Sequence, residues 1–360
     1  MSDFRTPGGT ASGRHHAITH NVVAARALQL VAENVAALDW HLRIDGTRIS
    51  QHPLLDRLAR PNTAMNQRSF LEAIAGHLKL SGQAFILAVE GEGAWPLAWH
   101  ILHPDSVTVE ANKDGWPNAY LYRAGKTLKR YPVDPVLGTS EVLHIRSFHP
   151  NNAQTGLGAL DTVGLAVELH SAAARWSRSL LENAARPSGA LVYEGQGGGP
   201  ATLTDEQFER LKSELLENYQ GHINAGRPLV LEGGLKWQQM AFSPADMDFN
   251  TTRNSAARDI ALAFGVPPML LGIPGDNTYA NYQEANRAFW RQTILPLARK
   301  IGDGIAGWVG RQAGRQIVLD INHETIPALA PEREVLWRQV NEADFLSVEE
   351  KRRLLGLETP

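Results

Sequence analysis

The sequence has no cysteine, no long apolar run and no excess of positive charge. Without cysteine the chain can form neither disulfide bonds nor thiolate metal sites, which fits a reducing compartment. No apolar run approaches the ~20 residues that a membrane-spanning helix needs, and the N-terminus lacks the basic-then-apolar layout of a signal peptide. Lysine and arginine total 35 against 38 aspartate and glutamate, so the net charge of −3 does not predict tight phosphate binding. We therefore expect a folded protein that is made in the cytoplasm and does not enter membranes.

Two glycine-containing motifs resemble nucleotide-binding loops but lack residues that such loops require. The Gly-Lys-Thr sequence at 125–127 matches the end of a P-loop, yet Tyr120 stands where the leading glycine belongs. The alternating sequence on both sides of it favours a β-hairpin. In EGQGGGP, residues 194–200, Pro200 replaces the third glycine of a dinucleotide-binding fingerprint. Neither motif predicts a nucleotide site, and we expect no cofactor.

Motifs for metal binding and catalysis are also incomplete. Pro327 stands where the zinc motif that begins at His323 needs its second histidine, and Thr251 replaces the turn glycine of a calcium-loop-like segment. No G-x-S-x-G nucleophile elbow occurs. We predict no metal site and no enzyme. Two alternatives stay open: a nucleotide-dependent enzyme with a degenerate glycine-rich loop, and a DNA-binding protein that does not recognise sequence, although the most basic cluster, 351–353, is too small for a recognition helix.

The first 157 residues predict a mixed α+β unit. Residues 20–38 form an amphipathic helix whose stripe is Val23, Ala27, Leu30, Val31, Asn34 and Leu38, with one polar exception. Residues 67–80 form a second helix, ending before Gly82, with an apolar face of Phe70, Ile74 and Leu78. Short alternating segments between residues 83 and 148 are separated by turn residues, which is typical of β-strands.

The pattern changes at Gly156. Residues 158–185 are rich in alanine and predict one long helix, which the Arg186–Pro187 step ends. A β-α-β-β module follows in residues 188–243, including a hairpin in 227–243. A second helix is predicted from an N-cap at Ser243 to Gly265. The module is thus flanked by two long helices.

The stretch GVPPMLLGIPGDNTYANY, residues 265–282, interrupts two helical segments. Met269 to Leu271 are expected to anchor it in apolar packing, and residues 275–281 are polar and expected to be mobile. Asn281 and Glu284 predict a capped helix start.

The helix that follows is expected to be kinked at Pro296. Its apolar stripe consists of Trp290, Ile294, Leu297, Ile301, Ile305 and Trp308. A strand at 316–321 and a helical tail with a capping box at Ser347 and Glu350 complete the predicted elements.

Six segments, in this order, resemble the portal proteins of tailed bacteriophages and gene transfer agents. They include GLGALDTVGLAVELHSAAARWSRSLLENAARPSGAL, ARDIALAFGVPPMLLG and NYQEANRAFWRQTILPLARKI, and their full ranges are 52–86, 142–148, 156–191, 257–272, 281–301 and 346–360. Each segment alone is moderately specific, but together they span nearly the whole chain after residue 18.

The resemblance implies an α+β portal fold with a wing, a long-helix stem, a small α/β clip, a kinked channel helix and a short helical crown. The corresponding segments are a flexible leader (1–17), the wing (18–157), stem helix 1 (158–187), the clip (188–243), stem helix 2 (244–266), the tunnel loop region (267–281), the long kinked helix with a strand returning to the wing (282–328) and the crown (329–360). The crown is brief, which is a departure from longer relatives that make contacts inside the capsid.

The same resemblance implies a function without catalysis. Portal proteins form a dodecameric ring at one capsid vertex, through which double-stranded DNA is packaged and ejected. The implied partners are other copies of the chain, double-stranded DNA contacted weakly and without sequence preference, the major capsid protein, the terminase large subunit and the head-tail adaptor. The implied location is the portal vertex of a virion or gene-transfer particle that is assembled from chains made in the bacterial host cytoplasm.

The resemblance also assigns roles to three groups of residues. The tunnel loop would present Asp276, Asn277, Thr278, Tyr279, Asn281 and Tyr282 to the DNA. Subunit packing in the stem would involve Ala172, Ala173, Ala174, Arg175, Arg178 and Glu182, since small side chains permit close helix approach and the charged ones are spaced to pair. The clip would contact the terminase and adaptor through Gln196, Gly197, Gly198 and Gly199.

Overall fold

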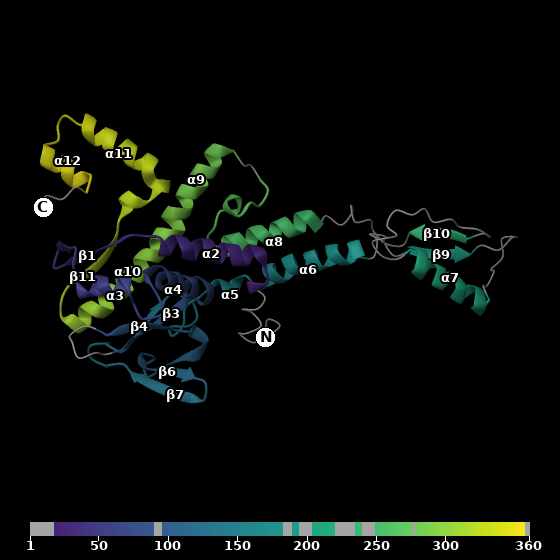
Figure 1. Ribbon diagram of the computed structural model, residues 1–360, viewed down its shortest axis with the longest axis horizontal. Coiled ribbons are helices and arrows are strands. Elements are labelled where there is room, and N and C mark those ends of the chain that lie inside the picture. The colour runs from purple at the N-terminus through teal and green to yellow at the C-terminus, as the bar shows by residue number, and fades with distance from the viewer. Residues whose placement is uncertain are drawn as a thin grey trace. The chain divides into compact units, whose positions relative to one another are not determined.

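The computed structural model describes residues 18–89, 96–182, 189–193, 204–219, 235–239, 249–275 and 278–356. Its Cα positions divide the chain into two compact units (Figure 1). Unit 1 comprises Met1–Gly164 together with Ile260–Pro360, and unit 2 comprises Leu165–Asp259. The chain therefore leaves unit 1 once and returns to it once, and the mixed α+β architecture is confirmed.

Two helices of unit 1, α2 (Val22–Ala36) and α4 (Gln67–Ser81), pack against each other. In α4 the predicted face of Phe70, Ile74 and Leu78 is buried, and Gly82 ends the helix with a left-handed φ of 71°. In α2 the predicted stripe is partly wrong: the buried residues are Ala24, Ala27, Val31, Ala32, Val35 and Ala36, whereas Val23, Leu30 and Asn34 are half-buried. Alanines on the inner face bring α4 close, which shifts the contact away from the larger side chains.

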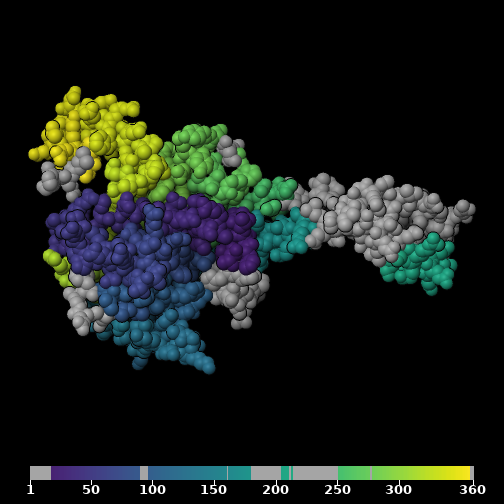
Figure 2. Space-filling view, in the orientation of Figure 1, coloured from purple at the N-terminus to yellow at the C-terminus, as the bar shows by residue number. Residues whose placement is uncertain are grey.

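Three small antiparallel sheets complete the layers of unit 1. One has the order β4 (Ala98–Leu102), β3 (Gln83–Val89), β8 (Val142–Arg146), and another is the meander β5 (Val107–Ala111), β6 (Pro117–Ala124), β7 (Thr127–Pro132). The predicted hairpin is confirmed, because Ala124 pairs with Thr127 across a turn in which Gly125 has a φ of 61°. In the third sheet, β11 (Ile317–Ile321) and β2 (Thr47–Ile49) flank β1 (Trp40–Ile44). In the space-filling view α2 is purple and the surface of α9 is green (Figure 2).

A long helical segment runs through unit 1 behind the stretch 265–282. It consists of α9 (Tyr279–Phe289), a π-helical turn η4 (Trp290–Ile294) and α10 (Leu295–Ala313). The predicted stripe is confirmed, since all of its members are buried: Trp290, Ile294, Leu297, Ile301, Ile305 and Trp308. The π-helical turn lies directly before Pro296, which has no N–H to donate to the preceding turn. The irregularity that the proline requires is therefore a widened turn.

Three glycines, Gly82, Gly156 and Gly158, allow the segment that precedes α5 (Ala159–Thr162) to cross closely over the end of α4. A Cβ on Gly156 would lie 1.8 Å from the carbonyl oxygen of Gly82, and a Cβ on Gly158 would lie 2.4 Å from the carbonyl oxygen of Leu80. The Gly82 oxygen also accepts a hydrogen bond from the backbone N–H of Ser147 at 2.7 Å. The close approach fixes where α5 begins.

The single long helix predicted for residues 158–185 is wrong, because it is divided into α5 and α6 (Gly164–Glu182) at Val163. The Asp161 carboxylate accepts a hydrogen bond from the Gly158 N–H at 3.1 Å, and the Thr162 hydroxyl donates to the carbonyl of Ala159 at 3.3 Å. These side chains bind backbone groups next to the break, as Asp and Thr do near helix ends. The predicted end of this helix, at Arg186–Pro187, lies outside the described residues.

Unit 2 contains most of α6, then β9 (Gly189–Tyr193), α7 (Asp205–Tyr219), β10 (Leu235–Gln239) and the first part of α8 (Phe249–Phe264). Strands β9 and β10 pair antiparallel, from Gly189 with Gln239 to Tyr193 with Leu235. The first strand of the hairpin predicted for residues 227–243 and the N-cap predicted at Ser243 fall outside the described residues. The unit therefore shows the predicted strand, helix and strand in the predicted order.

The C-terminal part of unit 1 contains four short or medium helical elements beyond β11 among the described residues. Two 3-10 turns, η5 (His323–Thr325) and η6 (Pro327–Leu329), lead into α11 (Ala330–Glu342), and α12 (Val348–Leu354) follows. The predicted capping box is confirmed: the Ser347 Oγ accepts from the Glu350 N–H at 3.3 Å, and the Glu350 carboxylate accepts from the Ser347 N–H at 2.8 Å. Unit 1 also contains α3 (Pro53–Ala59) and the 3-10 turns η1 (Pro104–Ser106) and η3 (Pro268–Leu271).

Candidate functional site

The N-cap and first turn of α9 contain those predicted DNA-facing residues that the structure describes. Thr278 is the N-cap, since its hydroxyl oxygen accepts a hydrogen bond from the Asn281 N–H at 3.2 Å. The capping role predicted for Asn281 and Glu284 is therefore wrong, and Asn281 lies inside the first turn. Tyr279 is 78% exposed and Tyr282 is 49% exposed. Two aromatic rings are thus presented to solvent from the first turn of α9.

Two predicted members of this group, Asp276 and Asn277, lie outside the described residues. The hydroxyl of Tyr279 accepts a hydrogen bond from the Gln283 amide at 3.1 Å, one turn further along α9. This bond holds the ring along the helix without burying it, so the aromatic face stays available for contact.

The turn between α8 and α9 is tied down at its base. Gly265 ends α8 with a φ of 69°, and the Thr293 hydroxyl donates to the Gly265 carbonyl at 2.6 Å. The 3-10 turn η3 (Pro268–Leu271) follows, but its side chains are only half-buried. The apolar anchor predicted at Met269 to Leu271 is instead supplied by its neighbours, since Val266 and Ile273 are buried.

Two arginines, one in the last turn of α9 and one in η4, are paired with carboxylates. Arg287 contacts Glu284 on the same helix and Glu332 of α11 at 3.5 Å, and Arg291 contacts Glu332 at 3.4 Å. A guanidinium that is paired in this way offers less charge to a phosphate. The start of α9, Tyr279 to Asn286, contains no lysine or arginine, so the surface there is aromatic and polar rather than basic.

Helix α6 exposes an apolar stripe, which consists of Leu165, Leu169, Ala172 and Trp176. Leu165 is 79% exposed, Leu169 is 45% exposed and Trp176 is 48% exposed, and Ala172 is exposed between them. The spacing of four, three and four residues places all of them on one face of the helix. The opposite face, which includes Val167, His170 and Ala173, is buried.

The residues predicted for subunit packing are divided between these faces. Ala172 belongs to the stripe, Ala173 is buried, and Ala174, Arg175 and Arg178 are exposed. Glu182 is the last residue of α6. The apolar repeat that defines the stripe is visible in the sequence, but the sequence does not tell which side of an isolated helix its own chain covers.

The glycine-rich segment predicted to contact other proteins, Gln196 to Gly199, lies outside the described residues. The helix that follows it, α7, begins with Asp205 and Glu206. Thr204 and Gln207 cap this helix reciprocally: the Thr204 N–H donates to the Gln207 side chain at 3.1 Å, and the Gln207 N–H donates to the Thr204 hydroxyl at 3.4 Å. The two acidic residues would repel a pyrophosphate at this helix end, and the N–H group of Gln207 is already bonded to the Thr204 hydroxyl.

Neither a metal site nor a membrane span is found among the described residues. No group of three or more His, Asp or Glu side chains is placed to hold a metal ion in that part of the chain. In the same residues, no helix combines the length and the apolar character needed to cross a bilayer.

Comparison with known proteins gives consistent matches over most of the chain. The family model described as phage portal protein matches residues 22–356. The probable portal protein of Streptomyces phage phiC31 is 27% identical over 94% of this chain and 74% of its own length. Two solved structures, the neck of an empty GTA particle computed with C6 symmetry and the neck of a native GTA particle computed with C12 symmetry, each contain a chain 44% identical to this one. The matches cover 98% of this chain and 95% of the other, with TM-scores of 0.78 and 0.76.

Proposed function

Because the chain belongs to the phage portal protein family, a family of structural proteins rather than enzymes, we propose that it forms a dodecameric ring in the neck of a gene transfer agent or phage particle. The ring conducts double-stranded DNA during packaging and ejection. Similarity at 44% identity to chains of a GTA neck, one of them computed with C12 symmetry, supports both the location and the stoichiometry. The segment boundaries given above for wing, stem, clip, tunnel loop and crown are part of this proposal.

The observation that carries the ring is the exposed apolar stripe on α6. Leu165, Leu169 and Trp176 expose apolar side chains to water on one face of the helix. This exposure is unfavourable in a single chain, and an apolar patch of this kind marks a contact surface for another protein. Burial of a leucine side chain stabilises an interface by about 1.5–3 kcal/mol. Because Ala172 lies in the middle of the stripe, a helix from a neighbouring copy can approach closely there.

Mass measurement of the purified protein tests the ring. We expect native mass spectrometry or mass photometry to show dodecamers at high concentration or in particles, and Leu169→Asp to shift the distribution toward single chains because it places a carboxylate in the stripe. The matched control is Leu128→Asp, which changes another exposed leucine, in β7. Loss of rings in both variants, or in neither, would refute the role given to the stripe.

The proposed DNA contact is made by the tunnel loop and the start of α9. Asp276, Asn277, Thr278, Tyr279, Asn281 and Tyr282 would face the channel, and only weak, replaceable contacts suit a conduit, because each neutralised phosphate adds affinity that translocation has to break. The pairing of Arg287 and Arg291 with Glu332 supports this weak contact.

Substitution of both tyrosines tests the channel role. We expect Tyr279→Ala together with Tyr282→Ala to change the amount of DNA packaged or retained in particles, while rings still form. Phe345→Ala, at an exposed aromatic residue outside this region, is the control. Particles with normal DNA content in the double variant would count against a channel position for these rings.

The proposed docking partners are the terminase large subunit, the head-tail adaptor and the major capsid protein. The clip, including Gln196, Gly197, Gly198 and Gly199, would contact the terminase and the adaptor. Ala172, Ala173, Ala174, Arg175, Arg178 and Glu182 would contribute to contacts between stem helices of neighbouring copies. Crosslinking from cysteines introduced singly into the cysteine-free chain would identify which partner each segment touches.

A further inference from the structure

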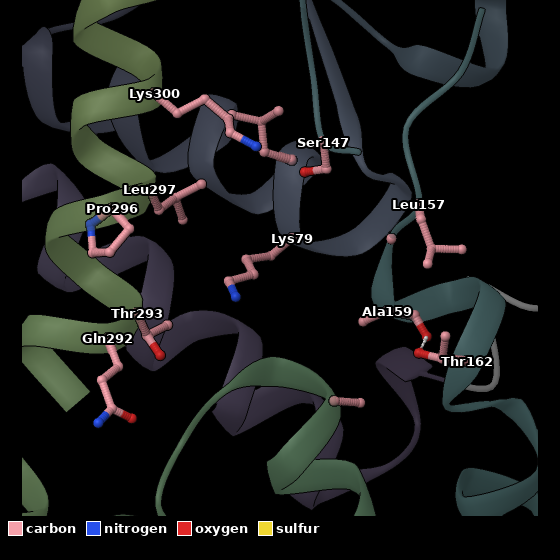
Figure 3. A pocket seen from close by; sticks show the side chains of 13 residues that line it. Lys79, Ser147, Leu157, Ala159, Thr162, Gln292, Thr293, Pro296, Leu297 and Lys300 are labelled. Carbon is pink, nitrogen blue, oxygen red and sulfur yellow. Dashed lines mark hydrogen bonds between the residues drawn. The ribbon is translucent and has the colours of Figure 1, made fainter. Parts of the chain in front are cut away.

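A cavity of about 400 Å³ lies within unit 1, and no part of the proposed function uses it (Figure 3). It is lined by α4, the entry to α5, the end of α8, η4 and the first turns of α10. Leu78, Leu157 and Leu297 form apolar walls, and Ser147, Gln292 and Thr293 add polar groups. This volume falls within the range of small-molecule sites in proteins.

The charge of the cavity lining is entirely positive. Lys79 points into the centre from α4, and Lys300 extends from α10 toward the same space (Figure 3). No aspartate or glutamate belongs to the lining. The acidic residue of α5, Asp161, accepts a hydrogen bond from the backbone N–H of Gly158. Among the described residues, neither lysine forms an ion pair or a hydrogen bond.

Lys79 is held in a position that disfavours its own charge. Burial lowers the pKa of its ammonium group, and the charge of Lys300 lowers that pKa further. The ammonium lies beside the turn that ends α8, where a Cβ on Gly265 would come within 3.6 Å of the Nζ. The carbonyl ends of α4 and α8 supply partial negative charge to this site, but they do not neutralise two ammonium groups.

We propose that the cavity is a binding site for a small, doubly charged oxyanion of the phosphate class, held between the Lys79 and Lys300 ammonium groups. The Thr293 hydroxyl already donates to the Gly265 carbonyl, so the neutral donor of the lining is the Ser147 hydroxyl. A dianion matches two lysines in charge, and it accepts several hydrogen bonds at once. The site does not depend on the proposed portal function.

Lysine labelling of the full-length protein tests the site, with inorganic phosphate as the probe. A brief acetic anhydride pulse followed by peptide mapping measures the free-amine fraction of each lysine. A bound dianion raises the pKa of Lys79, and since each pKa unit changes the free-amine fraction tenfold, we expect labelling of Lys79 to fall at least about tenfold at saturating phosphate. Lys113, which is exposed and is not part of the cavity lining, should not change.

Variants give an independent readout. Phosphate at constant ionic strength should raise the Tm of the wild type and of Lys113→Met, but not that of Lys79→Met or Lys300→Met. Methionine keeps the apolar length of the lysine stem, so Lys79→Met is expected to fold. Lys300 is exposed, so its variant keeps the test decisive if Lys79→Met does not fold.

Three outcomes would overturn the proposal. Unchanged labelling and unchanged Tm with phosphate would show that the cavity binds no dianion. Equal protection by chloride or acetate would show a general salt or carboxylate effect in place of a phosphate-class site. Protection of Lys79 that appears on ring formation in phosphate-free buffer would assign the cavity to an acidic side chain of a second copy.

Discussion

Substitution of Gly156 by alanine should destabilise unit 1 through a backbone clash that no side-chain movement can relieve. The added Cβ would lie 1.8 Å from the Gly82 oxygen, 2.5 Å from the Gly82 carbonyl carbon and 2.9 Å from the Ser147 nitrogen. The two segments would have to separate by more than an ångström, which would break the 2.7 Å hydrogen bond from the Ser147 N–H to the Gly82 oxygen.

The magnitude follows from these two effects. Overpacking of this kind costs about 1–3 kcal/mol, and loss of a buried hydrogen bond adds about 1–3 kcal/mol. We expect a decrease in the free energy of unfolding of about 3 kcal/mol, which at an m-value of about 3 kcal/mol/M lowers the urea midpoint by about 1 M. Tryptophan fluorescence can follow the transition, because Trp99 and Trp308 are buried in unit 1.

Gly76→Ala is the matched control. Gly76 lies in the middle of α4, and a Cβ there would meet no atom within 4 Å. Alanine in a helix interior is favoured over glycine by about 0.5–1 kcal/mol, so this variant should be slightly more stable than the wild type. A urea midpoint for Gly156→Ala within about 0.2 M of the wild type would refute the reasoning.

Two further predictions concern a helix cap and a buried histidine. Thr278→Ala removes the N-cap of α9 and should cost about 0.5–2 kcal/mol locally, so the Asn281 amide should exchange faster with solvent while the amides of α10 are unchanged; equal exchange would contradict the cap. Burial, aided by Arg146, lowers the pKa of His144 to about 3, so as pH falls from 6.5 toward 3 the unfolded chain binds a proton that the native chain does not, and stability is lost by up to about 1.4 kcal/mol per pH unit. Urea midpoints between pH 7 and pH 4 should therefore vary less in His144→Gln, and an unchanged slope would disprove this origin.

Elements whose signals are local could be predicted from the sequence. The apolar stripe of η4 and α10, the hairpin at Gly125 and the capping box of α12 each depend on residues close together in the sequence, and the structure confirms all three. The N-cap of α9 was misassigned because several residues near 278–281 have side chains suited to capping. Only the backbone geometry shows that Thr278 makes the bond.

Features formed by distant segments could not be predicted. The crossing of Gly82 with Gly156 joins residues that lie far apart in the sequence, and no periodicity of either segment indicates it. The cavity around Lys79 combines side chains from α4, α5, α8, η4 and α10, so its positive lining exists only after packing. The apolar repeat of α6 is visible in the sequence, but only the burial of the opposite face shows that this repeat is the exposed side of the helix.

The π-helical turn η4 also sets the rotational phase between α9 and α10. Each residue of an α-helix advances the chain by about 100° around the axis, and a π-helical turn holds one residue more than an α-helical turn. If the same five residues formed a regular α-helix instead, they would advance the chain by about 100° more, and α9 would be rotated by that angle relative to the buried stripe of α10. Tyr279 and Tyr282 would then point in a different direction although neither had been changed. The wide turn of η4 thus sets the direction in which α9 presents Tyr279 and Tyr282 relative to the packed part of the helical segment.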